Sequence, residues 1–460
     1  MELADGQRGL LDGYLGWFDP LVGDRRTGRL FRSAVAGIVG AESLVAARSA
    51  AFSPELAAGS RNGAQRLRRM ARGETTKRFE LDADALVGRL RAQAVAELAG
   101  EEEVWAVVDM AELRKPHARE MADLMRVRAL GGEGTVPGYR TLNVLGLGRG
   151  GRRGVLHHRL FSSTEETFAS ESREIRDALD AVGAAVAAQV GAVTSLMDSQ
   201  FDDAAVWGTI WGQGNHLVCR LKHPERLVEH PDGAGGGATA PLADALGRAR
   251  ELARVRAEML VRKRGQRREK RQPTTATVAA GPVRVRYRED ARTPRPGPER
   301  TADAWLVVVR LENVDAEPWL LLTDWPVEDA EQALRVFRMY RMRWAIEDSF
   351  KFTKQVLGWE DVQLLDLEAV RTLVALGWVA AGFLYHMGVT LEWPEVRLLA
   401  RLGGWEPRAD RPPGKTLLTR GLQSLLDHWR TEAILRDEIR RHGRLPPRLA
   451  ALLGPPWTDT

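Results

Sequence analysis

The chain has 460 residues, of which 44% are hydrophobic and 28% are charged, so its composition is that of a soluble globular protein. This length suffices for two to four domains with a sizeable core. A formal net charge of +5 favours a polyanionic partner without identifying one. The single cysteine, Cys219, excludes a disulfide within the chain and a cysteine-rich metal site.

The N-terminal residues lack the charged-then-apolar pattern of a signal peptide, so we expect a cytoplasmic protein. The most apolar segment, residues 373–389, is too short for a comfortable membrane span. We therefore expect this segment to form a buried helix, and we expect no membrane partner.

Residues 1–95 have the pattern of a helical domain, and the segment 61–78 within it is basic. A basic helix can contact phosphates, although such a face is often only solvated surface. The candidate phosphate contacts are Arg66, Arg68, Arg69, Arg72, Lys77 and Arg78.

Residues 96–222 alternate between strand and helix patterns, which predicts an α/β fold. Strands are expected at 104–108, 139–147, 154–161, 193–197 and 216–221, and helices at 165–190 and about 203–211. Asp109 directly follows the first strand, and Asp198 follows the strand at 193–197. Because a fold can bring strand ends together, both acids are candidate metal ligands. The alternative for each is an aspartate that caps a helix or forms a turn.

Residues 223–318 interrupt this alternation. They contain a glycine-rich stretch at 231–239, a basic segment at 243–271 that we expect to be partly helical, and strand patterns at 275–287 and 305–311. Residues 248–271 include eleven Arg and Lys against three Glu, so the basic excess of this segment exceeds that of the whole chain.

Residues 319–365 hold the most informative pattern, with a strand expected at 319–323 and a helix at 329–357. On a helix of about 100° per residue, one arc of about 60° holds Tyr340, Arg343, Glu347 and Lys354. Glu347 is a hard oxygen ligand suited to Mg²⁺, and the two cations can hold phosphate oxygens. The alternative is a solvated face with an ion pair between Arg343 and Glu347. Residues 366–460 are mostly helical in pattern, with breaks at Gly403-Gly404 and Pro412-Pro413.

The spacing Y-x2-R-x3-E-x6-K of these four residues resembles the signature of the IS4-type (Tn5-like) DDE transposases. The similarity extends over about 35 residues, through Trp319-Leu-Leu-Leu-Thr323, Ala333-Leu-Arg-Val336, Arg343-Trp344 and Ile346-Glu347. The resemblance implies an RNase H-like core of the retroviral integrase type, formed by 96–222 and 319–365. A β-rich insertion at 223–318 and helical domains at 1–95 and 366–460 would complete the chain, with the N-terminal domain binding terminal repeats.

The resemblance also implies that Asp109, Asp198 and Glu347 are the catalytic acids and hold two Mg²⁺ ions, for which Mn²⁺ can substitute. The competing acids are Glu112, Asp202 and Asp203. Two positions depart from the family's pattern. Met110-Ala111-Glu112 stands where the family often has Thr or Ser, and Ser199 stands where it has Arg, so the auxiliary contacts differ while the metal ligands are kept.

In this family the tryptophan that matches Trp319 stacks on a base flipped out of the transposon end, and Tyr340, Arg343 and Lys354 would hold the neighbouring phosphates. Stacking on an indole offsets about 1–3 kcal/mol of lost base stacking. The alternative for Trp319 is a core tryptophan in its strand.

We therefore expect a cut-and-paste transposase that binds terminal inverted repeats, cleaves at transposon ends through a hairpin, and joins the 3′-hydroxyls to target DNA. Its partners would be double-stranded DNA and a second copy in a homodimeric synaptic complex, in the bacterial cytoplasm at the nucleoid. Two alternatives are a domesticated, non-catalytic DNA-binding protein and a metal-dependent nuclease without strand transfer. The three acids and the full stripe argue against the first, and Trp319 with Tyr340 argues against the second.

Overall fold

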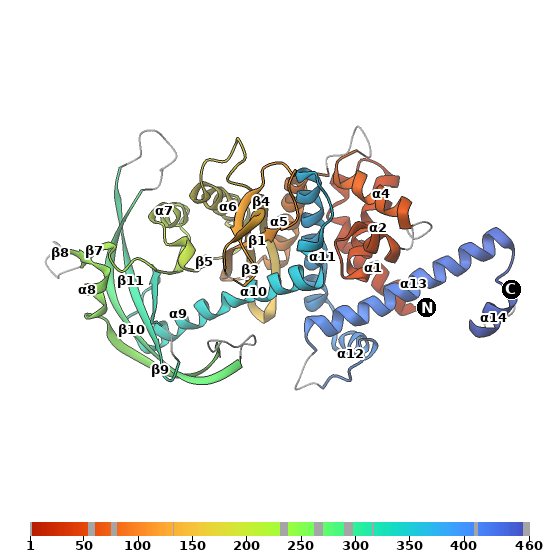
Figure 1. Ribbon diagram of the computed structural model, residues 1–460. Helices are drawn as coiled ribbons and strands as arrows, with labels where there is room; N and C mark the ends of the chain where they lie inside the picture. The colour runs from red at the N-terminus through yellow and green to blue at the C-terminus, as the bar shows by residue number, and fades with distance from the viewer. Residues whose placement is uncertain are drawn as a thin grey trace. The chain divides into compact units, whose positions relative to one another are not determined.

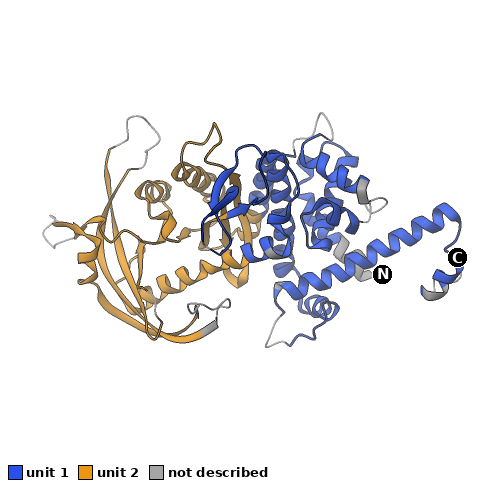
Figure 2. Ribbon diagram, in the orientation of Figure 1, with its two compact units in different colours: residues 1–93, 112–140, 350–460 blue, residues 94–111, 141–349 orange. Residues whose placement is uncertain are grey.

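The computed structural model describes residues 2–53, 60–74, 81–131, 133–230, 238–261, 270–288, 298–314, 317–408 and 413–453. The fold is mixed α/β, as the sequence predicts, and it divides into two compact units (Figure 2). We call residues 1–93, 112–140 and 350–460 the helical unit, and residues 94–111 and 141–349 the sheet unit. The division into five domains predicted from the sequence remains a prediction.

The sheet unit is built on one mixed sheet (Figure 1). Its first strands are β1 (Val104–Arg114), β3 (Thr135–Leu147), β4 (Arg153–Phe161), β5 (Val193–Met197) and β6 (His216–Arg220). The order across the sheet is β3-β1-β5-β6, with β4 paired to β3. The β1/β5 and β5/β6 pairs are parallel. Every residue of β5 is buried, including the polar Thr194 and Ser195 at its centre.

Two helices of the sheet unit contribute buried side chains to its core. Helix α6 (Glu171–Val186) begins after Ser170, whose hydroxyl accepts a hydrogen bond from Arg173 N. Helix α7 (Ala204–Gly212) begins after Asp203, which caps Ala205 N in the same way. Their buried side chains join those of β1, β5 and β6 in one apolar core. The strands and helices predicted for residues 96–222 are present, but their bounds differ: β1 is six residues longer than expected, β3 begins at Thr135, and the helix predicted at 165–190 spans only Glu171–Val186.

The predicted insertion extends this same sheet. Strand β12 (Trp319–Thr323) pairs with β6, and β11 (Arg300–Leu311), β10 (Lys270–Tyr287), β7 (Leu227–His230) and β8 (Ala238–Pro241) follow in that order. The long curved strand β9 (Arg250–Val261) pairs antiparallel with β10 (Figure 1). The glycine-rich residues 231–237 lie outside the described part of the chain.

Within the described residues of the basic segment 243–271, which we expected to be partly helical, the helix is limited to the short α8 (Leu242–Leu246), and residues 262–269 lie outside the described part of the chain. The described residues 250–261 form β9 instead. Arg254 and Arg256 are exposed while Ala253 and Ala257 are buried, so the segment alternates with the period of two expected for a strand. Its basic side chains mark the solvent face of the strand.

The helix predicted at 329–357 is interrupted. Helix α9 (Ala330–Met342) begins after Asp329, whose side chain accepts from Gln332 N, and α10 spans Trp344–Lys351. Between them, Arg343 N donates to Tyr340 O at 3.1 Å, so the last turn of α9 tightens. A π-helical turn, Phe352–Val356, follows α10. The predicted helical angle of Lys354 assumed α-helical geometry throughout and is therefore wrong.

The helical unit contains α1 (Glu2–Gly16), α2 (Arg25–Ala41), α3 (Ala46–Phe52), α4 (Ser60–Ala71), α11 (Leu367–Thr390), α12 (Trp393–Leu402), α13 (Lys415–His442) and α14 (Pro447–Leu453). Helix α5 (Ala83–Leu98) begins in this unit, and β2 (Met125–Arg128) pairs with the first residues of β3. Helix α11 packs against α1, α2, α4 and α13. The approach to α1 requires Gly382, because a Cβ there would lie 2.3 Å from the Tyr14 hydroxyl.

Helix α11 includes the apolar segment 373–389 and is buried, as predicted. Among the described residues it is the single helix that is long and apolar enough to cross a membrane, but 83% of its most apolar window is buried inside the protein. Helices α2 and α3 meet the same criterion only as a pair, bent by 99°. Tyr14 Oη donates to Val379 O at 3.2 Å, which fixes α1 on α11.

Candidate active site

The register of two parallel strands places Asp109 beside Asp198. In the β1/β5 pair, Val108 lies opposite Met197, so the next residue of each strand is an aspartate. Neighbouring strands lie about 4.8 Å apart, which brings the two carboxyl groups to one end of the sheet. Asp109 lies within β1 and is 7% exposed, whereas Asp198 follows β5 and accepts a hydrogen bond from Gln200 N at 2.8 Å.

Arg343 joins Asp109 to the third predicted acid. Its Nη1 donates to Asp109 Oδ2 at 3.3 Å, and its Nη2 donates to Glu347 Oε1 at 2.7 Å. Arg343 caps the C-terminus of α9, and Glu347 lies in the first turn of α10, so the helix junction presents both side chains to β1. The side chains of Asp109 and Arg343 are about nine-tenths buried, while 44% of the Glu347 side chain is exposed.

The negative charges of Asp198 and Glu347 both affect the pKa of Asp109. Burial, reinforced by the negative charge of Asp198, raises the pKa of Asp109 from its ordinary 3.8 to about 7. Arg343 and a hydrogen bond from Met110 N lower this pKa, and Glu347 raises it. Asp109 is therefore a buried carboxyl group with less positive charge around it than its ionised form requires.

The chemistry of these three carboxylates suits a divalent cation, but their present arrangement does not form a metal site. Three carboxylates supply the hard oxygen ligands that Mg²⁺ prefers, and a cation would relieve the repulsion that raises the pKa of Asp109. Among the described residues, no group of three His, Cys, Asp or Glu side chains is arranged to hold a metal ion. In this conformation the Arg343 guanidinium bridges Asp109 and Glu347.

The competing acids have structural partners. Asp202 forms an ion pair with Arg226 and accepts hydrogen bonds from the backbone of Lys222 and His223. Asp203 caps α7. Glu112 pairs with Arg114 at 3.3 Å in the helical unit. These contacts account for the three competitors without a metal ion.

Trp319 and Tyr340 lie in a buried aromatic cluster beside Arg343. Trp319 is 6% exposed, and its ring centroid lies 5.2 Å from that of Tyr340, 6.1 Å from Phe337 and 6.4 Å from Trp344. A base could stack on Trp319 only if this cluster opened, so the observed packing favours the alternative of a core tryptophan. The stacking role remains a prediction.

Arg220 is a cation near Tyr340 that the sequence did not lead us to expect at the site. Burial raises the pKa of Tyr340, and the positive charges of Arg343 and Arg220 lower it. The Arg343 guanidinium carbon lies 5.9 Å from the centre of the tyrosine ring. Arg220 ends β6, and the sequence signal was a cation directly after the buried run 217–219.

The other predicted DNA contacts lie in the helical unit or outside the residues that the structure describes. The Lys354 ammonium lies 6.0 Å from the Phe350 ring centroid. On α4, Leu67 and Met70 are buried, so the three arginines of this helix that we singled out face solvent: Arg66, Arg68 and Arg69. Lys77 lies outside the described residues. The exposed arginines are compatible with both DNA contact and a solvated face.

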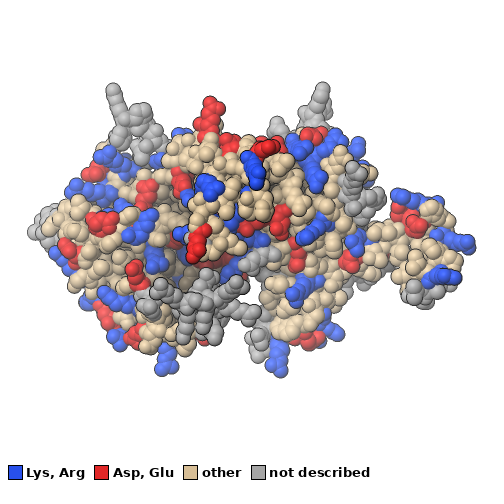
Figure 3. Space-filling model, in the orientation of Figure 1, with Lys and Arg blue, Asp and Glu red and all other residues tan. Residues whose placement is uncertain are grey.

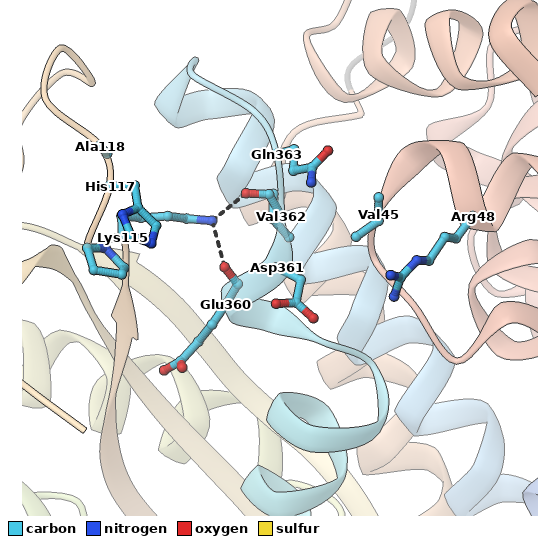
Figure 4. Close-up of a pocket in the computed structure, with 10 residues that line it drawn as sticks. Val45, Arg48, Lys115, His117, Ala118, Glu360, Asp361, Val362 and Gln363 are labelled. Carbon is cyan, nitrogen blue, oxygen red and sulfur yellow. Dashed lines mark hydrogen bonds between the residues drawn. The ribbon is translucent and has the colours of Figure 1, made fainter. Parts of the chain in front are cut away.

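The helical unit has a cavity of about 440 Å³ that the sequence did not indicate (Figure 4). Lys115 lies in its wall, and its Nζ donates to the carbonyl oxygens of Glu360, at 3.3 Å, and Val362. Burial lowers the pKa of Lys115 to about 8, although Asp361 and Glu360 oppose this shift. The amine therefore ties residue 115 to the 360–362 segment.

Charges of both signs are interspersed on the surface shown in Figure 3, over both units. The basic excess therefore does not form a single patch on that face. Comparison of the sequence with models of protein families and with curated proteins finds no match. The geometry around Asp109 is consequently the main basis for a functional argument.

Proposed function

We propose that this protein is a DDE transposase that cleaves at transposon ends and joins 3′-hydroxyls to target DNA. The observation that supports this most is the cluster of Asp109, Asp198 and Glu347. Three acids separated by long stretches of sequence meet electrostatically at the end of two parallel strands. A buried acid with a strongly raised pKa beside two further acids is characteristic of catalytic sites.

We further propose that residues 96–222 and 319–365 form an RNase H-like core. Three strands, a helix, a strand, a second helix and a further strand follow one another in β1, β3, β4, α6, β5, α7 and β6. The short β2 hairpin strand is an addition to this order. The strands between β6 and β12 then correspond to the β-rich insertion of the family that the sequence resembles.

The proposed chemistry is phosphoryl transfer at a phosphodiester. Asp109, Asp198 and Glu347 would hold Mg²⁺ or Mn²⁺, which when bound activates the attacking oxygen and stabilises the leaving one. Tyr340 and Arg220 lie beside the acids and would position the phosphate backbone. The exposed arginines of α4 would bind duplex DNA through its phosphates.

The partners proposed with this chemistry are double-stranded DNA at the terminal repeats and at the target, and a second copy of the chain in a homodimeric synapse. Such a protein would work at the bacterial nucleoid. A transposase that cleaves through a hairpin would also need a base-stacking residue, for which Trp319 is the candidate once its aromatic cluster opens.

A metal-dependent nuclease without strand transfer is the second candidate. It needs the same acids but no stacking tryptophan, and the burial of Trp319 favours it on that one point. The non-catalytic DNA-binding alternative is weaker, because it gives no reason for a buried carboxyl group with a strongly raised pKa.

The two catalytic candidates are separated by the products formed from labelled transposon ends, a target plasmid and Mg²⁺. A transposase yields end-joined plasmid, whereas a nuclease yields cut ends alone. Asp198→Asn should abolish both products. Asp203→Asn is the matched control, because asparagine is an equally good helix cap and the Asp203 side chain accepts a hydrogen bond from Ala205 N at the start of α7. Equal activity of the Asp198→Asn variant and the wild type would refute the assignment.

A further inference from the structure

Arg343 occupies an unusual position for a residue expected to hold DNA phosphates. Its two terminal nitrogens are both engaged by carboxylates, one from β1 and one from α10. The contact joins residues 234 positions apart in the sequence. Its Nε is buried and, among the described residues, has no hydrogen-bond partner. The guanidinium is thus held chiefly by the two acids.

At this position the Arg343 guanidinium supplies positive charge to the acids, as a bound metal ion would. It cannot lose its proton, so it offsets part of the negative charge of the acids at any physiological pH. Removing it would leave the buried carboxylate of Asp109 with still less compensation unless another cation replaces it. A divalent ion and the Arg343 side chain therefore compete for Asp109 and Glu347.

We propose that Arg343 is an internal counterion of the acid cluster and that its departure is coupled to the binding of a divalent cation. This inference rests on the proposed function, because it concerns the same acids. The released guanidinium has five donors in a planar fork that matches phosphate oxygens. A DNA backbone phosphate would draw Arg343 from the acids.

DNA and cation binding then reinforce each other. By linkage, if DNA raises the affinity for the cation, the cation raises the affinity for DNA by the same factor. The negative charge of the acid cluster is consequently offset in part by Arg343 in the free protein, and the cluster opens to a divalent ion when DNA is present. Such coupling would limit cleavage of DNA by a protein that has not engaged its proper site.

Arg341 is a matched control on the same helix. Its Nη2 donates to the carbonyl oxygen of Glu258 at 3.2 Å, and its guanidinium carbon lies 5.6 Å from the Phe337 ring centroid. It has the same charge as Arg343 but contacts none of the three acids in the hydrogen bonds or ion pairs of the described residues. A general loss of positive charge should affect both arginines alike.

The test is isothermal titration of the full-length, DNA-free protein with Mg²⁺ and with Mn²⁺ at pH 8.0. Arg343→Gln should bind the ion at least about tenfold more tightly than the wild type, because a charge of the same sign has left the site. The affinity of Arg341→Gln for the ion should stay within about twofold of the wild-type affinity, because Arg341 does not contact the three acids in the described structure and its charge is screened by salt. Arg343→Lys, which keeps the charge but cannot bridge both acids, should lie between wild type and Arg343→Gln, and it serves if the glutamine variant does not fold.

A second titration in the presence of duplex DNA should show wild-type affinity rising towards that of Arg343→Gln, with little change in the variant. Unchanged or weaker ion binding by both Arg343 variants overturns the inference. If, in that case, the wild type binds the ion and Asp109→Asn does not, the inference about Arg343 fails but the proposed metal site still stands. If neither the wild type nor any Arg343 variant binds an ion, the inference and the metal-dependent function both fail.

Discussion

Replacing Asp109 with asparagine should stabilise the metal-free protein at pH 8 while removing a proposed metal ligand. The reason is that the ionised side chain of Asp109 is buried without enough nearby positive charge to compensate it fully. Asparagine has nearly the same shape as the protonated aspartic acid but cannot ionise. The substitution therefore removes the unfavourable charge with little change in packing.

The magnitude follows from the raised pKa of Asp109, which is about 7 against an ordinary 3.8. A folded-state pKa above the unfolded value means that stability is fully present below pH 3.8 and is lost as the pH rises to about 7. The difference of about three units, at about 1.36 kcal/mol each, gives about 4 kcal/mol at pH 8. Near pH 5.5 it should be about 2 kcal/mol.

The assay is urea unfolding in EDTA at pH 5.5 and pH 8.0, followed by tryptophan fluorescence. Asp109→Asn should exceed the wild type in free energy of unfolding, and by more at pH 8.0. A variant that is less stable than the wild type at pH 8.0, or a difference independent of pH, would refute the reasoning.

Three further predictions concern activity. Asp198→Ala and Glu347→Ala should each abolish cleavage and joining yet leave end binding nearly intact in gel shifts, because they remove metal ligands and not cations; cleavage at a near-normal rate would exclude that residue as a ligand. Joint replacement by alanine of the α4 cations Arg66, Arg68 and Arg69 should reduce the slope of log affinity against log salt by about three; an unchanged slope would assign these arginines to solvated surface. Trp319→Ala should accumulate nicked ends with partial recovery in Trp319→Phe if the indole stacks on a base, whereas a lowered melting temperature with equal loss of every product would identify a purely structural tryptophan.

Much of the sheet unit follows from local pattern. The strand at 193–197 was predictable to the residue because Val193, Thr194, Leu196 and Met197 are β-branched or apolar residues typical of a short strand. Asp198 was conspicuous because it ends that run. The Arg343/Glu347 contact was predictable from its spacing of four residues, which places both side chains on one face across the helix junction.

What the sequence could not supply depends on contacts between distant segments. Neither strand pattern encodes the register that sets Val108 opposite Met197. The local sequence pattern therefore did not predict that Asp109 lies beside Asp198. The ion pair between Arg343 and Asp109 likewise depends on tertiary packing. In β9, a high local content of arginine concealed the period-two alternation that the strand needs for its partner β10.

Strand transfer by the purified protein tests the assignment of Asp109, Asp198 and Glu347 most directly. The substrate is a labelled duplex that carries candidate terminal inverted repeats, with a supercoiled plasmid as target and Mg²⁺ as the ion. We predict labelled plasmid from the wild type, and none from the three alanine variants or in EDTA. Protein that binds the ends but forms no joined product with Mg²⁺ or Mn²⁺ would contradict the proposed transposase.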